Sequence, residues 1–214
     1  MSLETGTCVA LRAQAVAQSI RHPEVIVPAN VDAQSLANLR DHELMPYFVD
    51  IHPGLYVLRA QDCVPEIRME RTVGLYAPSI YGNTPELAPI LAACAVHDMM
   101  ALVDEVDEVP QIGFAALYEA LAFYGDRIVY PERCQDIPQT WWTCFPFVVR
   151  DAAKAPCVLQ ALTPFGAQKA HGCSTSDALW HARLPGAMQI ETCGIVVPLD
   201  ADPAAIADAL DNTL

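Results

Sequence analysis

Apolar side chains recur at helical spacing over residues 7–20, a stretch without internal proline or glycine. This pattern predicts a helix that ends before the histidine–proline pair at 22–23. The β-branched run 25–27 predicts a short strand. Asp32 is a strong N-cap residue and predicts a further helix that ends before Pro46.

The pattern changes after residue 46 to one that is typical of strands. Residues 47–51 and 55–58 are rich in aromatic and β-branched side chains, and His-Pro-Gly separates the two runs. Proline fixes one backbone angle and glycine accepts a positive φ, so this triplet suits a tight turn. We therefore predict a β-hairpin over 47–58 and a third strand over 71–77.

The middle of the chain predicts helices. Thr84, Pro85 and Glu86 have the order of cap, first helical residue and acidic first turn. The helix that they begin is apolar on nearly all sides as far as residue 103, which favours a central position in the fold. A second predicted helix, over 112–124, stops at a glycine. We expect the two helices to form a helical hairpin over about 84–125.

The last third of the chain returns to strand-like segments. These lie at 127–130, 145–150, 157–162 and 188–199, with short predicted helices at 177–184 and 204–210. The order of elements is neither a regular strand–helix alternation nor all-helical. We therefore predict an α+β fold in which a mixed or mainly antiparallel sheet packs against the central hairpin, as a single domain over 1–214.

Charge excludes some partners. The chain carries 12 Lys and Arg against 26 Asp and Glu, for a formal net charge of −14. So acidic a chain repels nucleic acids and anionic membranes, and no apolar run is long enough to span a bilayer. Charged residues make up only 18% of the sequence, below the roughly 25% of ordinary soluble domains. We expect part of the neutral surface to be covered by a protein partner or by self-association.

Eight cysteines are present, and no two of them are closer than ten residues apart. The C-x-x-C spacing that grips zinc is therefore absent. An acidic residue near the start of the chain argues against a secretory signal. We predict a cytoplasmic protein with free thiols in a reducing compartment and no bound metal. No glycine-rich nucleotide-binding pattern occurs, so we expect no cofactor.

One segment brings chemically reactive residue types together. His171 and Cys173 lie just before the helix that is predicted to begin near Asp177. A helix N-terminus and a neighbouring imidazolium both lower a thiol pKa, so Cys173 is the best candidate nucleophile and His171 its partner. The alternative is a plain capping loop, because Ser and Asp in this order are typical of helix starts.

An aromatic patch offers a candidate interface, made of Trp141, Trp142, Phe145 and Phe147. Together with the low charge density, it favours a non-catalytic protein that acts through protein–protein contacts, as an adaptor, an inhibitor or an assembly component. The alternative is a cysteine-dependent enzyme that uses the Cys173/His171 pair. A third hypothesis is a domain that binds a small molecule between the sheet and the helices.

Overall fold

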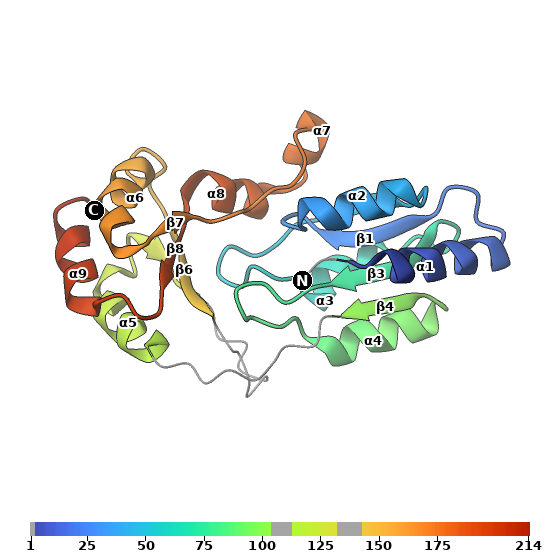
Figure 1. Ribbon diagram of the computed structural model, residues 1–214, viewed down its shortest axis with the longest axis horizontal. Helices are drawn as coiled ribbons and strands as arrows, with labels where there is room; N and C mark the ends of the chain where they lie inside the picture. Colours follow the sequence, from blue (N-terminus) through green and yellow to red (C-terminus); the bar gives the residue numbers. More distant parts are fainter. Residues whose placement is uncertain (1–2, 104–112, 132–142) are drawn as a thin grey trace.

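A four-stranded parallel sheet forms one half of the molecule. The computed structural model describes residues 3–103, 113–131 and 143–214 (Figure 1). The sheet has the order β2-β1-β3-β4, and every neighbouring pair is parallel. Its strands are β1 (Glu24–Pro28), β2 (Met45–Val49), β3 (Thr72–Ala77) and β4 (Met100–Val103).

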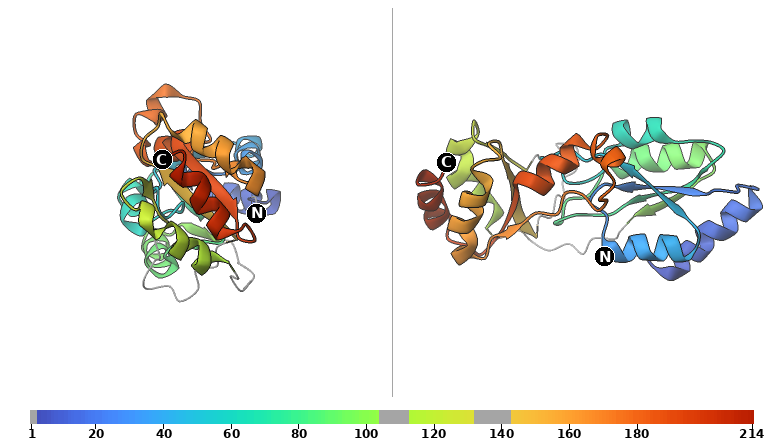
Figure 2. Two further views of the ribbon diagram at one scale, coloured as in Figure 1. Left: turned by 90° about the vertical axis from the view of Figure 1, so that its left-hand side faces the viewer. Right: turned by 90° about the horizontal axis from the view of Figure 1, so that it is seen from above.

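Helices cover both faces of this sheet. On one face lie α1 (Thr5–Ala17) and α2 (Ala33–Asp41), and on the other lie α3 (Ala60–Cys63) and α4 (Leu87–Val96), as Figure 2 shows. The 3₁₀ turn η1 (Val64–Glu66) continues α3. Because both faces are covered, β1 and β3 are buried along their whole length, as expected for the central strands of a parallel sheet.

The other half is built on an antiparallel sheet of order β5-β6-β8-β7. Its strands are β5 (Ile128–Val129), β6 (Cys144–Val149), β7 (Gln168–Lys169) and β8 (Gly194–Pro198). Around it pack α5 (Phe114–Leu121), α6 (Ala155–Leu162) and α9 (Pro203–Asp211), with the 3₁₀ turns η2 (Ala122–Tyr124) and η3 (Thr163–Phe165). The two short helices α7 (Ala178–His181) and α8 (Pro185–Cys193) reach from this half toward the parallel sheet (Figure 1).

Local signals in the sequence predict several of these elements well. The Asp32 carboxylate caps α2 by accepting a hydrogen bond of 2.8 Å from the Ser35 N–H, and Asp202 caps α9 in the same way. The α+β class is confirmed, with one parallel and one antiparallel sheet. Within the described ranges, no helix has both the length and the apolar character needed to cross a membrane.

The predicted helical hairpin over 84–125 is wrong. Helix α4 ends at Val96, the backbone takes a positive φ of 50° at Asp98, and the next apolar residues form β4. Helix α4 then packs beside β4, whereas α5 packs on α9 and β6 in the other half. A continuous apolar run is compatible with a buried helix and with a buried strand, and here it supplies one of each.

Four predicted strands also differ from the structure. Residues 45–49 pair in parallel with β1 instead of forming a hairpin with 55–58, which belong to no strand. The segment 157–162 lies in α6, where Pro156 takes a position in the first helical turn. Residues 188–193 complete α8, so the final strand of the antiparallel sheet is only β8.

Candidate functional site

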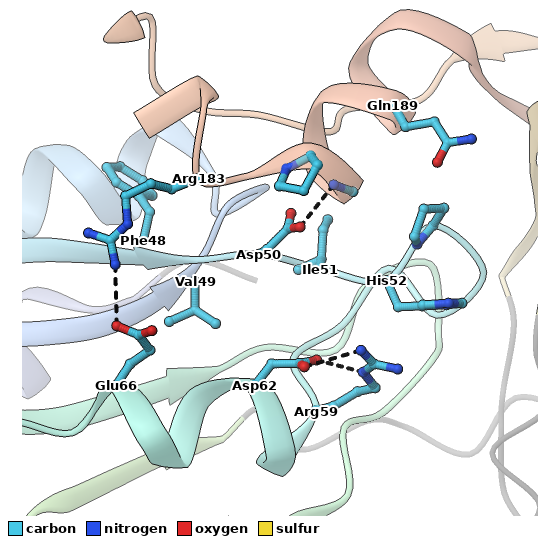
Figure 3. A pocket seen from close by; sticks show the side chains of 13 residues that line it. Phe48, Val49, Asp50, Ile51, His52, Arg59, Asp62, Glu66, Arg183 and Gln189 are labelled. Carbon is cyan, nitrogen blue, oxygen red and sulfur yellow. Dashed lines mark hydrogen bonds and ion pairs between the residues drawn. The ribbon is translucent and has the colours of Figure 1, made fainter. Parts of the chain in front are cut away.

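A cavity of about 420 Å³ opens at the carboxyl end of β2 (Figure 3). Its walls come from the turn after β2, from the segment that contains α3 and η1, and from the start of α8. Ligand pockets commonly have volumes of about 300–1,000 Å³. In sheets with parallel strands, ligands bind outside the carboxyl ends of the strands. Both its size and its place make this cavity the candidate site.

Asp50 connects the end of β2 to helix α8. Its two carboxylate oxygens accept hydrogen bonds of 2.9 Å from the Gly186 N–H and 2.8 Å from the Ala187 N–H. These amides belong to the first turn of α8, where the helix dipole favours a negative charge. Glycine is required at 186, because a Cβ there would lie 2.1 Å from the Ile51 carbonyl oxygen. The carboxylate thus holds the start of α8 against the end of β2, and both segments line the cavity.

A second acidic group on the wall is paired with an arginine. The Arg59 guanidinium donates two hydrogen bonds to Asp62, with Nε–Oδ2 at 2.5 Å and the other N–O distance at 3.1 Å. Both side chains are about 30% exposed, at 32% and 28%. A two-pronged arrangement of this kind holds the planes of both groups in place. The pair presents a fixed donor and acceptor surface to the cavity (Figure 3).

The far end of the cavity carries a second ion pair. The Arg183 guanidinium lies 3.4 Å from a Glu66 carboxylate oxygen and donates a hydrogen bond of 2.6 Å to the Tyr47 hydroxyl. The same hydroxyl donates to Glu66. Arg183 also lies over the Trp180 ring, with 5.1 Å to its centroid. These contacts link the loop before α8 to η1 and β2.

His52 supplies an imidazole to the lining. Its Nδ1 accepts a hydrogen bond of 3.2 Å from the Gly54 N–H, so in the neutral ring the proton is on Nε2. The cavity therefore combines carboxylates, guanidinium groups and one imidazole.

The loop that follows β2 is held by asparagines from two neighbouring strands. Asn30, just after β1, donates a hydrogen bond of 3.0 Å to the Tyr56 carbonyl oxygen. Asn83, in the turn after β3, donates one of 2.6 Å to the Leu55 carbonyl oxygen. Both asparagines are buried, and Tyr56 has a positive φ of 64°. The segments that follow β1 and β3 thus hold this loop in place.

Another cavity, of about 630 Å³, lies at the opposite edge of the same sheet. It is lined by residues that precede β1, β3 and β4, among them Arg21, His22, Glu70 and His97. This amino edge is not where parallel sheets ordinarily bind ligands. Its side chains therefore serve as controls for the candidate site.

His171 and Cys173 both contact Glu191, at 3.6 Å from His171 Nδ1 and 3.3 Å from the Cys173 N–H to Oε2, but the imidazole Nε2 and the thiol engage other partners. His171 Nε2 lies 2.9 Å from Ser174 Oγ, while the Cys173 thiol donates to the Thr175 carbonyl oxygen at 3.5 Å. Burial raises the pKa of the Cys173 thiol, which is the opposite of the activation expected from the sequence. The helix that follows is α7, which has only four residues. The assignment of Cys173 as nucleophile with His171 as its partner stays a prediction.

Glu191 explains how the segment around these residues is held. Its carboxylate accepts hydrogen bonds from the N–H groups of Gly172 and Cys173, at 3.0 and 3.3 Å, and pairs with Lys169 at 2.9 Å. Burial acts to raise the pKa of Glu191, but these hydrogen bonds and the Lys169 charge lower it by more. The segment is therefore tied to α8 through one carboxylate.

The residues of the predicted interface divide into two groups. Phe145 and Phe147 are fully buried in β6, so their rings belong to the core. Trp141 and Trp142 lie outside the described residues. Seven described cysteines carry free thiols. Among the described side chains, no group of three or more potential metal ligands comes together.

The sequence does not reveal the cavity, because its local pattern predicts a hairpin over 47–58 and not the parallel pairing of β2 with β1. Asp50 directly follows an apolar strand, and this is the signal that was available. In a hairpin such a residue is only part of a turn, whereas in a parallel sheet it lies at the edge where ligands bind.

Comparison with known proteins identifies the fold. The sequence matches no protein-family model, and a search of curated proteins returns no match. Among solved structures, 3-amino-5-hydroxybenzoic acid synthase is similar with a TM-score of 0.76 at 12% identity, over 96% of this chain and 85% of that one. The sugar aminotransferase CalS13 from Micromonospora echinospora gives 0.68 at 13%, over 98% and 86%. GDP-4-keto-6-deoxymannose-3-dehydratase gives 0.74 at 11%, over 98% and 85%.

At such low identity, the likeness shows that the chain shares the fold of these proteins. All three are enzymes by name. This finding contradicts the prediction of a non-catalytic protein that acts through protein–protein contacts, whether as adaptor, inhibitor or assembly component. It agrees better with the alternative that the chain is an enzyme.

Proposed function

We propose that this chain is an enzyme that binds a small hydroxylated metabolite in the cavity beside Asp50. One observation carries the proposal: charged groups of both signs and an imidazole converge on a single cavity at the carboxyl edge of a parallel sheet. Pockets that combine apolar walls with a few convergent polar groups are the usual sites of ligand binding.

The similar structures suggest the class of ligand. The name of one denotes an aminotransferase of sugars, and that of another denotes a dehydratase of a GDP-linked keto sugar. The lining of the cavity suits such a ligand, because carboxylates accept hydrogen bonds from hydroxyl groups and guanidinium groups donate to their oxygens. Free amino sugars and nucleotide-linked hexoses are therefore the compounds to test.

Separate roles follow for the lining residues. The Arg59–Asp62 and Arg183–Glu66 pairs lie on the lower wall and at one end of the cavity (Figure 3), and they orient the ligand through its hydroxyl groups. Asp50 is occupied by the amides of α8 and positions that helix. His52 is the group that takes or gives a proton on the bound ligand.

Calorimetric titration of the two ligand classes tests this proposal. Replacing one charged hydrogen-bonding group typically costs about 1.5–3 kcal/mol. Asp62→Asn is therefore expected to weaken binding by about 10- to 100-fold. The matched control is Glu70→Gln in the amino-edge cavity, which leaves binding unchanged. Equal effects of the two substitutions, or no binding of either class, would count against the proposal.

A further inference from the structure

The similar structures raise the question of a cofactor. The dehydratase was solved with a trapped PLP–glutamate geminal diamine, and the structure of NtdA from Bacillus subtilis contains bound PMP. Enzymes that use PLP hold it as a Schiff base on a lysine amine. Whether this chain can hold PLP as a Schiff base therefore depends on where its lysines lie.

The 214-residue sequence contains only two lysines, Lys154 and Lys169. Lys154 precedes α6, and its ammonium group donates a hydrogen bond to the carbonyl oxygen of Leu214. Both α6 and the C-terminus lie on the side of the antiparallel sheet that faces away from the parallel sheet (Figure 1). This amine is outside the cavity lining.

Lys169, in β7, lies against the face of α8 that points away from the cavity. Its amine pairs with Glu191 Oε1 at 2.9 Å, and its side chain is 53% exposed. The cavity is lined by Pro185, Gly186 and Gln189 of this helix. Glu191 follows Gln189 by two residues, which is a rotation of about 200° around the axis. The lysine that Glu191 holds therefore lies across the helix from the cavity.

The cations that do line the cavity are the guanidinium groups of Arg59 and Arg183. Guanidinium groups stay protonated at every accessible pH. They therefore have no free amine with which a carbonyl can condense.

We infer that this chain does not hold PLP as a lysine Schiff base in the cavity, and that its ligand is bound non-covalently by the ionisable side chains of the lining. The inference rests on the proposed function, since it concerns the same cavity. The shared architecture is thus retained with neither lysine in the lining of the cavity.

Borohydride trapping tests the inference directly. The full chain is incubated with PLP, reduced with sodium borohydride, digested and mapped by mass spectrometry. We expect at most partial pyridoxyl modification of Lys154, Lys169 and the N-terminal amine, to the same extent in the wild type and in Asp62→Asn. A stoichiometric adduct on one lysine that Asp62→Asn abolishes would overturn the inference.

A lysine-free variant gives an independent readout. Lys154→Arg combined with Lys169→Arg keeps both positive charges, including the partner of Glu191. We expect the affinity for the hydroxylated ligand to stay within about twofold of the wild type, whereas a loss above tenfold would overturn the inference. If no ligand binds at all, the proposed function fails, while the trapping result still decides the question of the Schiff base.

Discussion

At the scale of single residues, Asp50 is the cavity residue that joins the end of β2 to the first turn of α8. Its carboxylate caps the first turn of α8, where it binds the amide of Gly186, 136 residues later in the chain. The N-cap residue of α8 itself, Leu184, has no side-chain acceptor to offer. The first turn of α8 therefore depends on an acceptor from the parallel sheet.

Asp50→Ala is expected to destabilise the protein by about 1–2 kcal/mol, because two amides of α8 lose their acceptor. The matched control is Asp202→Ala, which removes the exposed cap of α9. It is expected to cost only about 0.5–1 kcal/mol. Urea denaturation of both variants gives the comparison. If Asp50→Ala costs no more than Asp202→Ala, the assigned role of Asp50 is wrong.

The reactivity of the thiols tests whether Cys173 is an activated nucleophile. Cys157 is exposed, whereas Cys173 is half-buried and burial raises its thiol pKa. A raised pKa leaves less thiolate to react. With limiting iodoacetamide at pH 8, we expect Cys157 to be alkylated before Cys173, and His171→Ala to leave the rate at Cys173 unchanged. Faster reaction of Cys173, slowed by that substitution, would contradict this expectation and support the cysteine-enzyme hypothesis.

At the scale of elements, the sequence predicts helix caps, which depend on neighbouring residues. It does not predict strand pairing, which depends on distant residues. Asp32 and Asp202 cap their helices as expected because an N-cap bond spans two or three residues. The pairing of β2 with β1 is different, since parallel strands meet only through a crossover connection. The turn residues at 52–54 indicate a hairpin locally, yet the apolar segment before them is buried beside β1.

The same limit explains the site. Asp50, Glu66 and Arg183 are far apart in sequence, and only the parallel topology with α8 above it brings them to one cavity. The spacing of these three residues in the sequence does not indicate that they share a site. His171 and Cys173 had such a signal, but the ring and the thiol follow local hydrogen bonds to other partners.

The tie between α8 and the segment at 169–173 predicts a pH dependence. The pKa of Glu191 is lower in the folded state, where hydrogen bonds and Lys169 outweigh burial, than in the unfolded chain. A carboxyl group with a lowered folded pKa stabilises the protein above its unfolded pKa, about 4.3, and loses this contribution as the pH falls through the folded value. We expect Glu191→Gln to be less stable than the wild type at pH 7, and the difference to shrink in acid.

Urea denaturation at pH 7 and at lower pH measures this difference. Glu119→Gln, a substitution of an exposed residue on α5, is the control, and we expect it to change stability little at either pH. A difference between the wild type and Glu191→Gln that grows as the pH falls below about 4.3 would contradict the assigned role of Glu191.

At the scale of the whole molecule, the parallel sheet and helix α8 together form the cavity. The sheet contributes the turn after β2, and α8 reaches it from the antiparallel half (Figure 1). Neither half contains the complete lining. The ion pair between Arg183 and Glu66 and the capping by Asp50 are among the contacts that hold the two walls together.

NMR titration tests whether the ligand binds in this cavity. Backbone amide NMR spectra are recorded while the chain is titrated with the tightest-binding amino sugar or nucleotide-linked hexose. We expect the largest shifts at 50–52, 59–66 and 183–189. Shifts confined to the amino-edge cavity at 18–22 and 69–71, or spectra that no ligand changes, would contradict it.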